Sequence, residues 1–282
     1  MGRVIQRGEG PPIVLVPGIQ GRHEWHLPTV DALATLGHVI TFSLCDEPTS
    51  HFAWSESAGF ENYLVQLADV LRVTCVERPL LVGISYGGLI SAEYAARHPG
   101  ALSGLVIASA PSPSWSLPVR AQRYLASPRL MAPAFWLGAP GRAYPELKAA
   151  FPQGRDRWAF VVDQGLRIAA APAAASRMAR RLRWLENGRF SMARGIDVPA
   201  LIVTGESELE RVVPPEDTLR YHEWLPHARV ETMAHTGHSG TVTRAAEFAR
   251  LVAEFMRPLP TGSAAVPSLD SPAGSIRADR VS

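Results

Sequence analysis

Short apolar runs alternate with longer helical patterns in the first 110 residues of the chain. Strand-length runs lie at 12–16, 38–44, 79–84 and 102–109, and segments with helical character lie at 61–74 and 86–97. This alternation is typical of βα units, which build a mostly parallel sheet flanked by helices. The pattern therefore predicts an α/β fold, with little room before the first of these strands for an additional hairpin.

The pattern changes between residues 115 and 194, where strand-like runs are absent. Helical periodicity there predicts helices over 143–151, 157–171 and 173–186, and the βα pattern resumes with strands at 199–205 and 228–233 and helices at 215–224 and 243–256. We therefore expect an α/β core of residues 1–114 and 195–257 and a helical cap of residues 115–194. Residues 258–282 are rich in Pro, Ser, Ala and Gly without periodicity, so we expect a disordered tail.

The composition is that of a globular protein with one sizeable core. Hydrophobic residues make up 46% and charged residues 19% of the 282 residues, which excludes disordered, fibrous and membrane classes. The N-terminal residues lack the apolar segment of a secretory signal, and no stretch approaches the roughly 20 apolar residues of a membrane span. Cys45 and Cys75 lie in or beside apolar runs, which indicates core thiols in a reducing compartment. We therefore expect a cytoplasmic protein without a membrane partner.

The net charge of +2 conceals an uneven distribution. Residues 115–194 hold 14 basic and 4 acidic residues, a surplus of +10, which leaves −8 for the rest of the chain. This surplus favours either attraction of an anionic substrate or pairing of the cap with the acidic core. No basic and aromatic recognition motif accompanies the charge, so we expect no nucleic-acid partner.

Residues Gly83 to Gly87 form a G-x-S-x-G motif between a predicted strand and a predicted helix. A serine in such a turn adopts a strained backbone that lifts its hydroxyl out of the sheet, and the flanking glycines avoid collisions. The free N–H groups at the helix start face the same point and can stabilise an oxyanion. The motif predicts Ser85 as a nucleophile; the alternative is a glycine-rich turn that binds a phosphate or no ligand.

A serine hydroxyl needs a base that an acid orients. His238 is the favoured base, because it lies in the loop between the strand at 228–233 and the last helix, and His235 in the same loop is the alternative. The acid is sought after the strand at 199–205, where three glutamates and no aspartate follow. We favour Glu208, keep Glu210 as the alternative acid, and interpret Glu206 as a loop carboxylate. A solvated acidic turn without a catalytic acid also fits this sequence.

A tight turn follows the first predicted strand at Pro17 and Gly18. The next backbone N–H, from Ile19, can point at a substrate carbonyl oxygen, and the N–H of Tyr86 supplies a second donor. These two residues are the predicted oxyanion hole.

The chain resembles the α/β-hydrolase fold superfamily over about residues 10–257. Three features carry the resemblance: the chain order of Ser85, the acid and His238; the serine turn after the third clear strand; and the helical insertion after the strand that follows. The likeness is strongest to small cap-bearing bacterial hydrolases of the esterase, lactonase and C–C-bond hydrolase kind. It implies an α/β-hydrolase fold with a mostly parallel sheet, a Ser-His-acid triad and no metal or other cofactor. The family's acid commonly lies three residues after the glycine, as Glu208 does, and a few residues before a Val-Pro pair, as Glu210 does.

The loop that follows residues 38–44 departs from the family's usual G-x-G-x-S turn. Asp46, Glu47 or His51 is therefore a candidate to face the substrate. Under the resemblance, residues 115–194 cover the pocket, and their aromatic residues either line it or pack the cap. The candidates to line the pocket are Trp115, Trp136 and Trp158.

The sequence thus predicts a serine hydrolase that cleaves a small-molecule ester, thioester, lactone or activated C–C bond through an acyl-enzyme on Ser85. A non-catalytic binding protein that keeps this fold and a cofactor-free acyltransferase are the alternatives. The oligomeric state does not follow from the sequence.

Overall fold

A seven-stranded sheet forms the centre of the computed structural model, which describes residues 2–115, 117, 119–192 and 195–259. The strand order is β1-β3-β2-β4-β5-β6-β7, with β1 antiparallel to β3 and every other neighbouring pair parallel. The strands are β1 (Val4–Arg7), β2 (Pro12–Val16), β3 (His38–Phe42), β4 (Leu80–Ile84), β5 (Gly104–Ala108), β6 (Ala200–Thr204) and β7 (Arg229–Thr232). The α/β-hydrolase fold expected from the sequence is confirmed.

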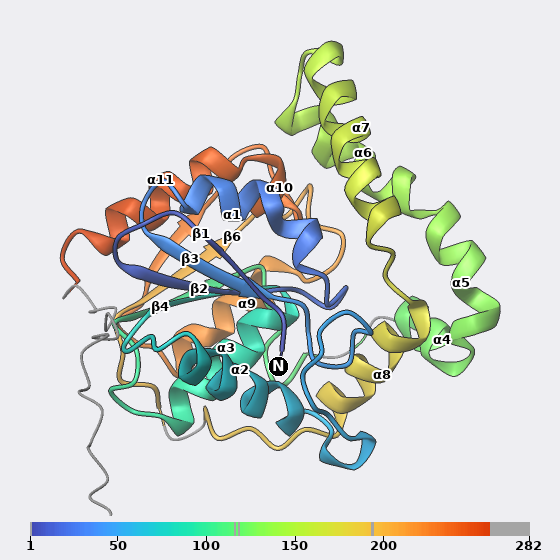
Figure 1. Ribbon diagram of the computed structural model, residues 1–282. Helices are drawn as coiled ribbons and strands as arrows, with labels where there is room; N and C mark the ends of the chain where they lie inside the picture. The colour runs from blue at the N-terminus through green and yellow to red at the C-terminus, as the bar shows by residue number, and fades with distance from the viewer. Residues whose placement is uncertain (1, 116, 118, 193–194, 260–282) are drawn as a thin grey trace, which may run out of the picture.

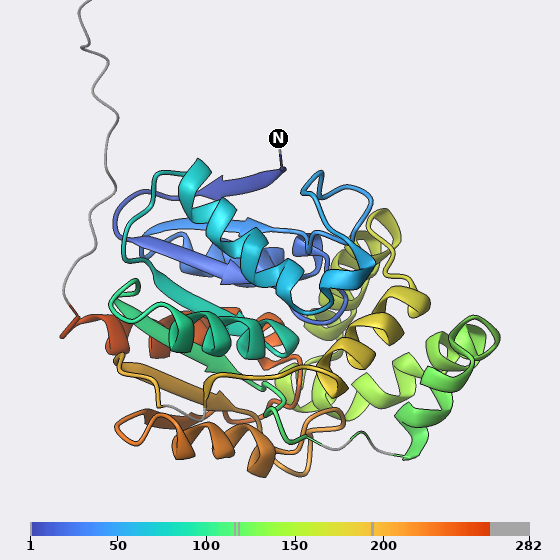
Figure 2. The same cartoon turned by 90° about the horizontal axis from the view of Figure 1, so that it is seen from below.

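Helices cover both faces of the sheet (Figures 1 and 2). Alternate residues of a strand point to opposite faces, so Ile13 packs in one apolar cluster and Val14 in the other. The cluster around Ile13 includes residues of α1 (Leu27–Leu33) and α11 (Ala245–Met256). The cluster around Val14 includes residues of α2 (Glu61–Val73), α3 (Tyr86–Arg97) and the 3₁₀ turn η4 (Arg220–Glu223), which follows α9 (Pro215–Leu219).

Among the described residues, five α-helices lie in sequence between β5 and β6, and we call them the helical insert. They are α4 (Val119–Ala126), α5 (Pro128–Leu137), α6 (Ala139–Ala150), α7 (Gly154–Ala170) and α8 (Ala175–Glu186). Figure 2 shows them gathered at one side of the sheet, with α8 next to the core. The three helices predicted at 143–151, 157–171 and 173–186 correspond to α6, α7 and α8.

Strand β1 and helices α1, α4 and α5 are among the described elements that were not expected from the sequence. Strand β1 pairs antiparallel with β3, although little room for a hairpin was expected there. Helix α1 is only seven residues long, and α4 and α5 are separated at Ser127 and Pro128, with Pro133 inside α5. These breaks interrupt the repeat of apolar residues by which a helix is predicted from a sequence.

Three further expectations concern the cysteines, the tail and membrane helices. Cys45 is buried, but Cys75 is exposed at the end of α2, so the expectation of two core thiols holds for Cys45 alone. The expected tail from residue 260 onward lies outside the described residues. In the part of the chain that the structure describes, no helix has the length and apolar character needed to cross a membrane.

The tight packing of α3 under the sheet predicts a steep cost for a methyl group at Gly87. A Cβ at Gly87 would collide with the main-chain carbonyl oxygens of Val16 and Pro17, which cannot rotate away. We expect Gly87→Ala to lower the free energy of unfolding by about 1–3 kcal/mol in urea denaturation. Gly165→Ala is the matched control: Gly165 is exposed inside α7 with no atom within 4 Å of the added Cβ, so this substitution should stabilise by about 0.5–1 kcal/mol. Equal effects of the two substitutions would contradict this packing.

Candidate active site

Ser85 connects β4 to α3 in a backbone conformation that non-glycine residues rarely adopt. Its φ is 53° and its ψ is −122°, in the positive-φ region that costs an L-residue about 1–3 kcal/mol. Main-chain hydrogen bonds hold it: the Ser85 N–H donates to the Ala108 carbonyl over 2.8 Å, and the Gly88 N–H donates to the Ser85 carbonyl over 2.8 Å. The hydroxyl is thereby fixed at the end of β4, beside the N-terminus of α3.

His238 reaches Ser85 from the loop that follows β7. Its Nε2 lies 3.0 Å from the Ser85 Oγ, although the two residues are 153 positions apart in the chain. The alternative base, His235, is exposed and takes part in the same loop through its backbone, whose N–H donates to Glu206 Oε1 over 3.0 Å. The structure therefore brings His238, and not His235, to the serine.

Glu210, and not Glu208, lies beside His238. The Nδ1–H of His238 donates to Glu210 Oε2 over 3.3 Å, and Glu210 Oε1 accepts the N–H groups of Val212 and Val213 over 2.7 and 3.1 Å. Glu208 is exposed, which corrects the sequence-based preference for it. The reason is a helical turn after β6, in which the N–H groups of Leu209 and Glu210 both donate to the Glu206 carbonyl, so that Glu210 returns to the site.

The imidazole and the carboxylate stabilise each other's charge. Burial alone would lower the pKa of His238, but the charge and hydrogen bond of Glu210, with a further contribution from the charge of Glu146, raise it above 6.5. Burial alone would raise the pKa of Glu210, but the charge and hydrogen bond of His238 and the N–H groups of Val212 and Val213 lower it. Glu210 is thus suited to hold an imidazolium that forms when His238 accepts a proton.

A second buried carboxylate, Glu146 of α6, supports the histidine loop from the helical insert. It is 5% exposed, and it accepts the Ser239 N–H over 3.1 Å and the Thr243 hydroxyl over 3.3 Å. Burial raises the pKa of Glu146, against the effect of the N–H groups that it accepts. The sequence did not indicate this residue, because nothing local distinguishes it from an exposed glutamate on an amphipathic helix.

The predicted oxyanion loop lies next to the serine. A Cβ built on Gly18 would be 3.4 Å from the Ser85 Cβ, and the turn from Gly18 is closed by the Gly21 N–H, which donates to the Gly18 carbonyl over 2.9 Å. Tyr86, the other predicted donor, is the first residue of α3. Both backbone segments therefore lie next to Ser85, and the oxyanion hole formed by the N–H groups of Ile19 and Tyr86 stays a prediction.

His26 contacts the predicted oxyanion loop, which its position in the sequence did not reveal. The Gly18 N–H donates to His26 Nε2 over 3.3 Å. Burial, with smaller contributions from His23 and His238, lowers the pKa of His26 to about 4. The ring is therefore neutral at physiological pH, so its Nε2 keeps the lone pair that accepts this hydrogen bond.

The three tryptophans predicted to line the pocket occupy different environments. Trp115 packs against the core, and Trp136 meets Trp25 of the core edge-on with ring centroids 6.2 Å apart. Trp158 is 68% exposed on α7, and its place in the substrate pocket stays a prediction. A substrate contact of Trp115 and Trp136 stays a prediction.

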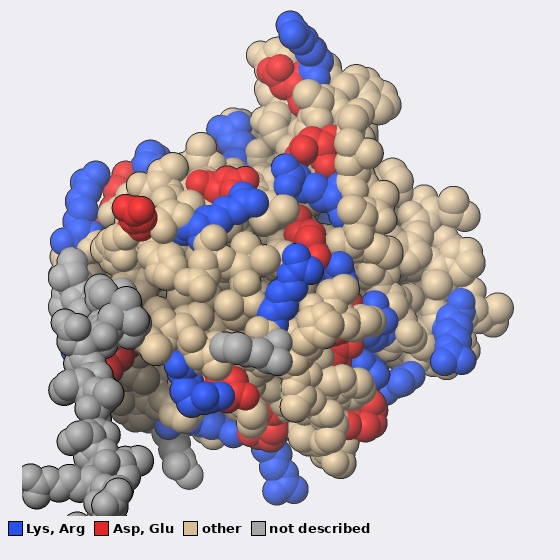
Figure 3. Space-filling model, viewed as in Figure 1, with Lys and Arg blue, Asp and Glu red and all other residues tan. Residues whose placement is uncertain are grey.

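The acidic residues after β3 are not free to face a substrate. Asp46 and Glu47 are buried and pair with arginines of α8, whereas His51 is exposed. These pairs cross from the helical insert to the core, so the insert's basic surplus is in part neutralised by core carboxylates. On the face shown in Figure 3, basic and acidic residues are intermixed rather than gathered into a continuous basic patch.

Among the described residues, no cluster of three or more His, Cys, Asp or Glu side chains is arranged to hold a metal ion.

Comparison with known proteins agrees with this geometry. The profile of the alpha/beta hydrolase family matches residues 13–251. The chain is 23% identical to "Putative carbamate hydrolase RutD" of Pseudomonas savastanoi pv. phaseolicola, over 89% of this chain and 95% of that protein. It is 26% identical to 2-hydroxy-6-oxo-2,4-heptadienoate hydrolase of Pseudomonas putida, over 88% of this chain and 90% of that protein.

Solved structures show the same fold. An esterase from Exiguobacterium antarcticum superposes with a TM-score of 0.73 at 17% identity, covering 90% of this chain and 94% of the esterase. The enol-lactonase from Burkholderia xenovorans superposes with a TM-score of 0.69 at 20% identity, covering 90% and 95%. Because the family profile spans most of the sequence, and the sheet and the serine turn agree with it, the chain belongs to the alpha/beta hydrolase family.

Proposed function

We propose that this chain is a serine hydrolase that cleaves a carboxylic ester, thioester, lactone or activated C–C bond through an acyl-enzyme on Ser85. The observation that carries the proposal is the continuous hydrogen-bonded series from the Ser85 hydroxyl through His238 to Glu210, with distances of 3.0 and 3.3 Å. A serine, a base and an acid in this series are the groups that acyl transfer requires.

The mechanism follows from these positions. His238 Nε2 takes the proton of the Ser85 hydroxyl as the oxygen attacks the substrate carbonyl, and Glu210 stabilises the imidazolium. The N–H groups of Ile19 and Tyr86 hold the oxyanion of the tetrahedral intermediate. His238 then returns the proton to the leaving group, and a water molecule, activated by the same imidazole, releases the acid product from Ser85.

The relatives support a carbonyl substrate without specifying it. Their names describe hydrolases of a carbamate, an enol-lactone and a 2-hydroxy-6-oxo-2,4-heptadienoate, and each of these substrates contains a carbonyl group. We infer a small-molecule substrate that binds between Ser85 and the helical insert, which serves as the cap. The two unpaired cysteines, Cys45 and Cys75, support a cytoplasmic location.

A fluorophosphonate probe tests the nucleophile. It reacts only with a serine whose hydroxyl is activated by its surroundings, so the folded wild-type protein should be labelled at Ser85 within minutes. Ser85→Ala should not be labelled, and heat-unfolded wild type is the control for non-specific reaction. Absence of labelling of the folded wild type would overturn the proposed function and leave the fold assignment intact.

Glutamate-to-glutamine substitutions test the acid. We expect Glu210→Gln to lower kcat on a p-nitrophenyl ester by about 10²–10⁴-fold, because the imidazolium loses its charged partner. Glu208→Gln is the matched control, since Glu208 lies in the same turn but is exposed, and its kcat should stay within about threefold of wild type. A larger loss in Glu208→Gln than in Glu210→Gln would contradict the assignment.

The pH dependence of kcat/KM reports on the same pair. Only neutral His238 accepts a proton, so kcat/KM should rise with pH through the pKa of His238, which lies above 6.5. In Glu210→Gln the carboxylate no longer raises that pKa, so the neutral form is reached at lower pH and the midpoint should move down. A midpoint that does not move, or moves upward, would be incompatible with an ionised Glu210 beside His238.

A further inference from the structure

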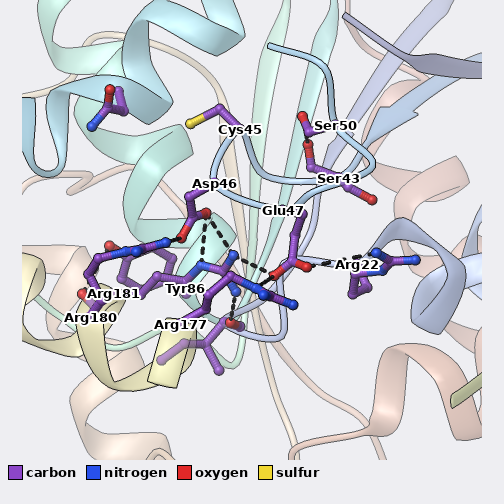
Figure 4. A network of polar contacts seen from close by, with 12 residues as sticks. Arg22, Ser43, Cys45, Asp46, Glu47, Ser50, Tyr86, Arg177, Arg180 and Arg181 are labelled. Carbon is purple, nitrogen blue, oxygen red and sulfur yellow. Dashed lines mark hydrogen bonds and ion pairs between the residues drawn. The ribbon is translucent and has the colours of Figure 1, made fainter. Parts of the chain in front are cut away.

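One fully buried cation of the helical insert has no part in the mechanism above. The side chain of Arg181, on α8, is 0% exposed and lies where α8 meets the loop after β3 (Figure 4). Its guanidinium donates to Asp46 Oδ1 over 2.7 Å and to Glu47 Oε1 over 2.7 Å. Burial would lower the pKa of Arg181, but Asp46 and Glu47 raise it, so the charge is retained.

The same guanidinium also reaches the predicted oxyanion loop. Its Nη1 donates to the main-chain carbonyl of Ile19 over 2.7 Å. The loop folds onto the guanidinium, since a Cβ at Gly21, whose φ is 73°, would lie 2.5 Å from Nη1. On the opposite side, the hydroxyl of Tyr86 donates to the Arg181 carbonyl over 3.2 Å. Arg181 thus contacts both residues that are predicted to supply the N–H groups of the oxyanion hole.

Two neighbouring arginines of α8 share the carboxylates but not this contact. Arg177 donates to Glu47 over 2.9 Å and Arg180 donates to Asp46 over 2.8 Å, and their side chains are 23% and 21% exposed. In the described part of the chain, the side-chain hydrogen bonds of both end on carboxylates, whereas Arg181 also bonds to a backbone carbonyl. The helix therefore carries its own matched controls.

The planar guanidinium suits this position. The N–H donors of a guanidinium have fixed directions in one plane. Asp46 and Glu47 hold one edge of the Arg181 guanidinium, so they also determine the direction in which Nη1 points. The Ile19 carbonyl belongs to the peptide plane after Cα and the Ile19 N–H to the plane before it. A hydrogen bond to the carbonyl therefore acts on the N–H by limiting rotation about φ and ψ of Ile19. Donors of an oxyanion hole act through such preorganisation, because a donor already in place need not reorient as negative charge develops.

We propose that Arg181 is a positioning residue of the oxyanion hole, supplied by the helical insert, which holds Ile19 in the orientation that stabilises the tetrahedral intermediate. The proposal rests on the proposed function and adds that docking of α8 is a condition for full activity. Arg181 acts through Ile19 and does not itself contact the substrate.

The test compares Arg181→Met with Arg180→Met and Arg177→Met on a p-nitrophenyl ester. We expect Arg181→Met to lower kcat at least tenfold with KM changed less than threefold, because the lost interaction acts in the transition state. The two control variants should keep kcat within about threefold of wild type. Since Arg181→Met leaves Asp46 and Glu47 without this partner, its folding is checked by circular dichroism.

Arg181→Lys is the second variant, in case Arg181→Met does not fold. Its ammonium keeps the charge for Asp46 and Glu47 but lacks the fork that reaches Ile19 at the same time. Inhibition by a trifluoromethyl ketone, which forms a tetrahedral adduct on the serine, gives a readout that loss of stability alone would not move. We expect Ki to rise at least tenfold in Arg181→Lys and to stay near the wild-type value in Arg180→Met.

The outcomes separate this proposal from the proposed function. Wild type that hydrolyses the ester, together with a folded Arg181→Lys whose kcat and Ki match those of Arg180→Met, would overturn the role of Arg181 and leave the serine mechanism standing. Wild type that neither hydrolyses esters nor reacts with the fluorophosphonate would overturn both.

Discussion

The left-handed backbone of Ser85 is the constraint around which the site is arranged. The residue ends a central strand and precedes the first turn of α3, with a φ of 53°, and its N–H remains paired with Ala108 of the neighbouring strand β5. The surrounding glycines make this possible, because side chains at Gly83 and Gly87 would collide with backbone atoms. The serine hydroxyl consequently stands clear of the sheet, where loops from three other parts of the chain converge on it.

The helical insert contributes to this convergence through buried charges of opposite sign. Arg181 donates to the Ile19 carbonyl in the predicted oxyanion loop, and Glu146 accepts hydrogen bonds from the histidine loop. An unpaired buried charge costs several kcal/mol, so Asp46 and Glu47 favour the arrangement in which α8 is docked. The near-neutral net charge of +2 is thus the sum of an acidic core and a basic insert that partly neutralise each other at their contact.

The strands that build the centre of the sheet were predictable because each is an apolar run of strand length between turn residues. The serine turn was predictable because it directly follows such a strand. His238 was predictable because its loop lies between the predicted strand at 228–233 and the last helix. Strand β1 and helices α4 and α5 were missed, because a short edge strand and helices broken by proline lack a sustained period.

The acid and the positioning residues depend on contacts that local sequence does not encode. Choosing Glu210 over Glu208 required the turn after β6, in which the N–H groups of Leu209 and Glu210 both donate to the Glu206 carbonyl. Arg181 lies 162 positions from Ile19, and its neighbours Arg180 and Arg177 look equivalent in the sequence. The complementary charges of the insert and the core indicated that pairs would form, but only the packing of α8 decides which arginine is buried.

The most direct measurement is the mass of the covalent intermediate. The protein is mixed with p-nitrophenyl acetate, quenched in acid during the first turnover and digested, and the peptide that contains Ser85 is examined by mass spectrometry. An acetyl group on Ser85 should appear as p-nitrophenolate is released and disappear as turnover continues. Ester turnover with no adduct on that peptide, or with an adduct confined to another residue, would contradict acyl transfer through Ser85.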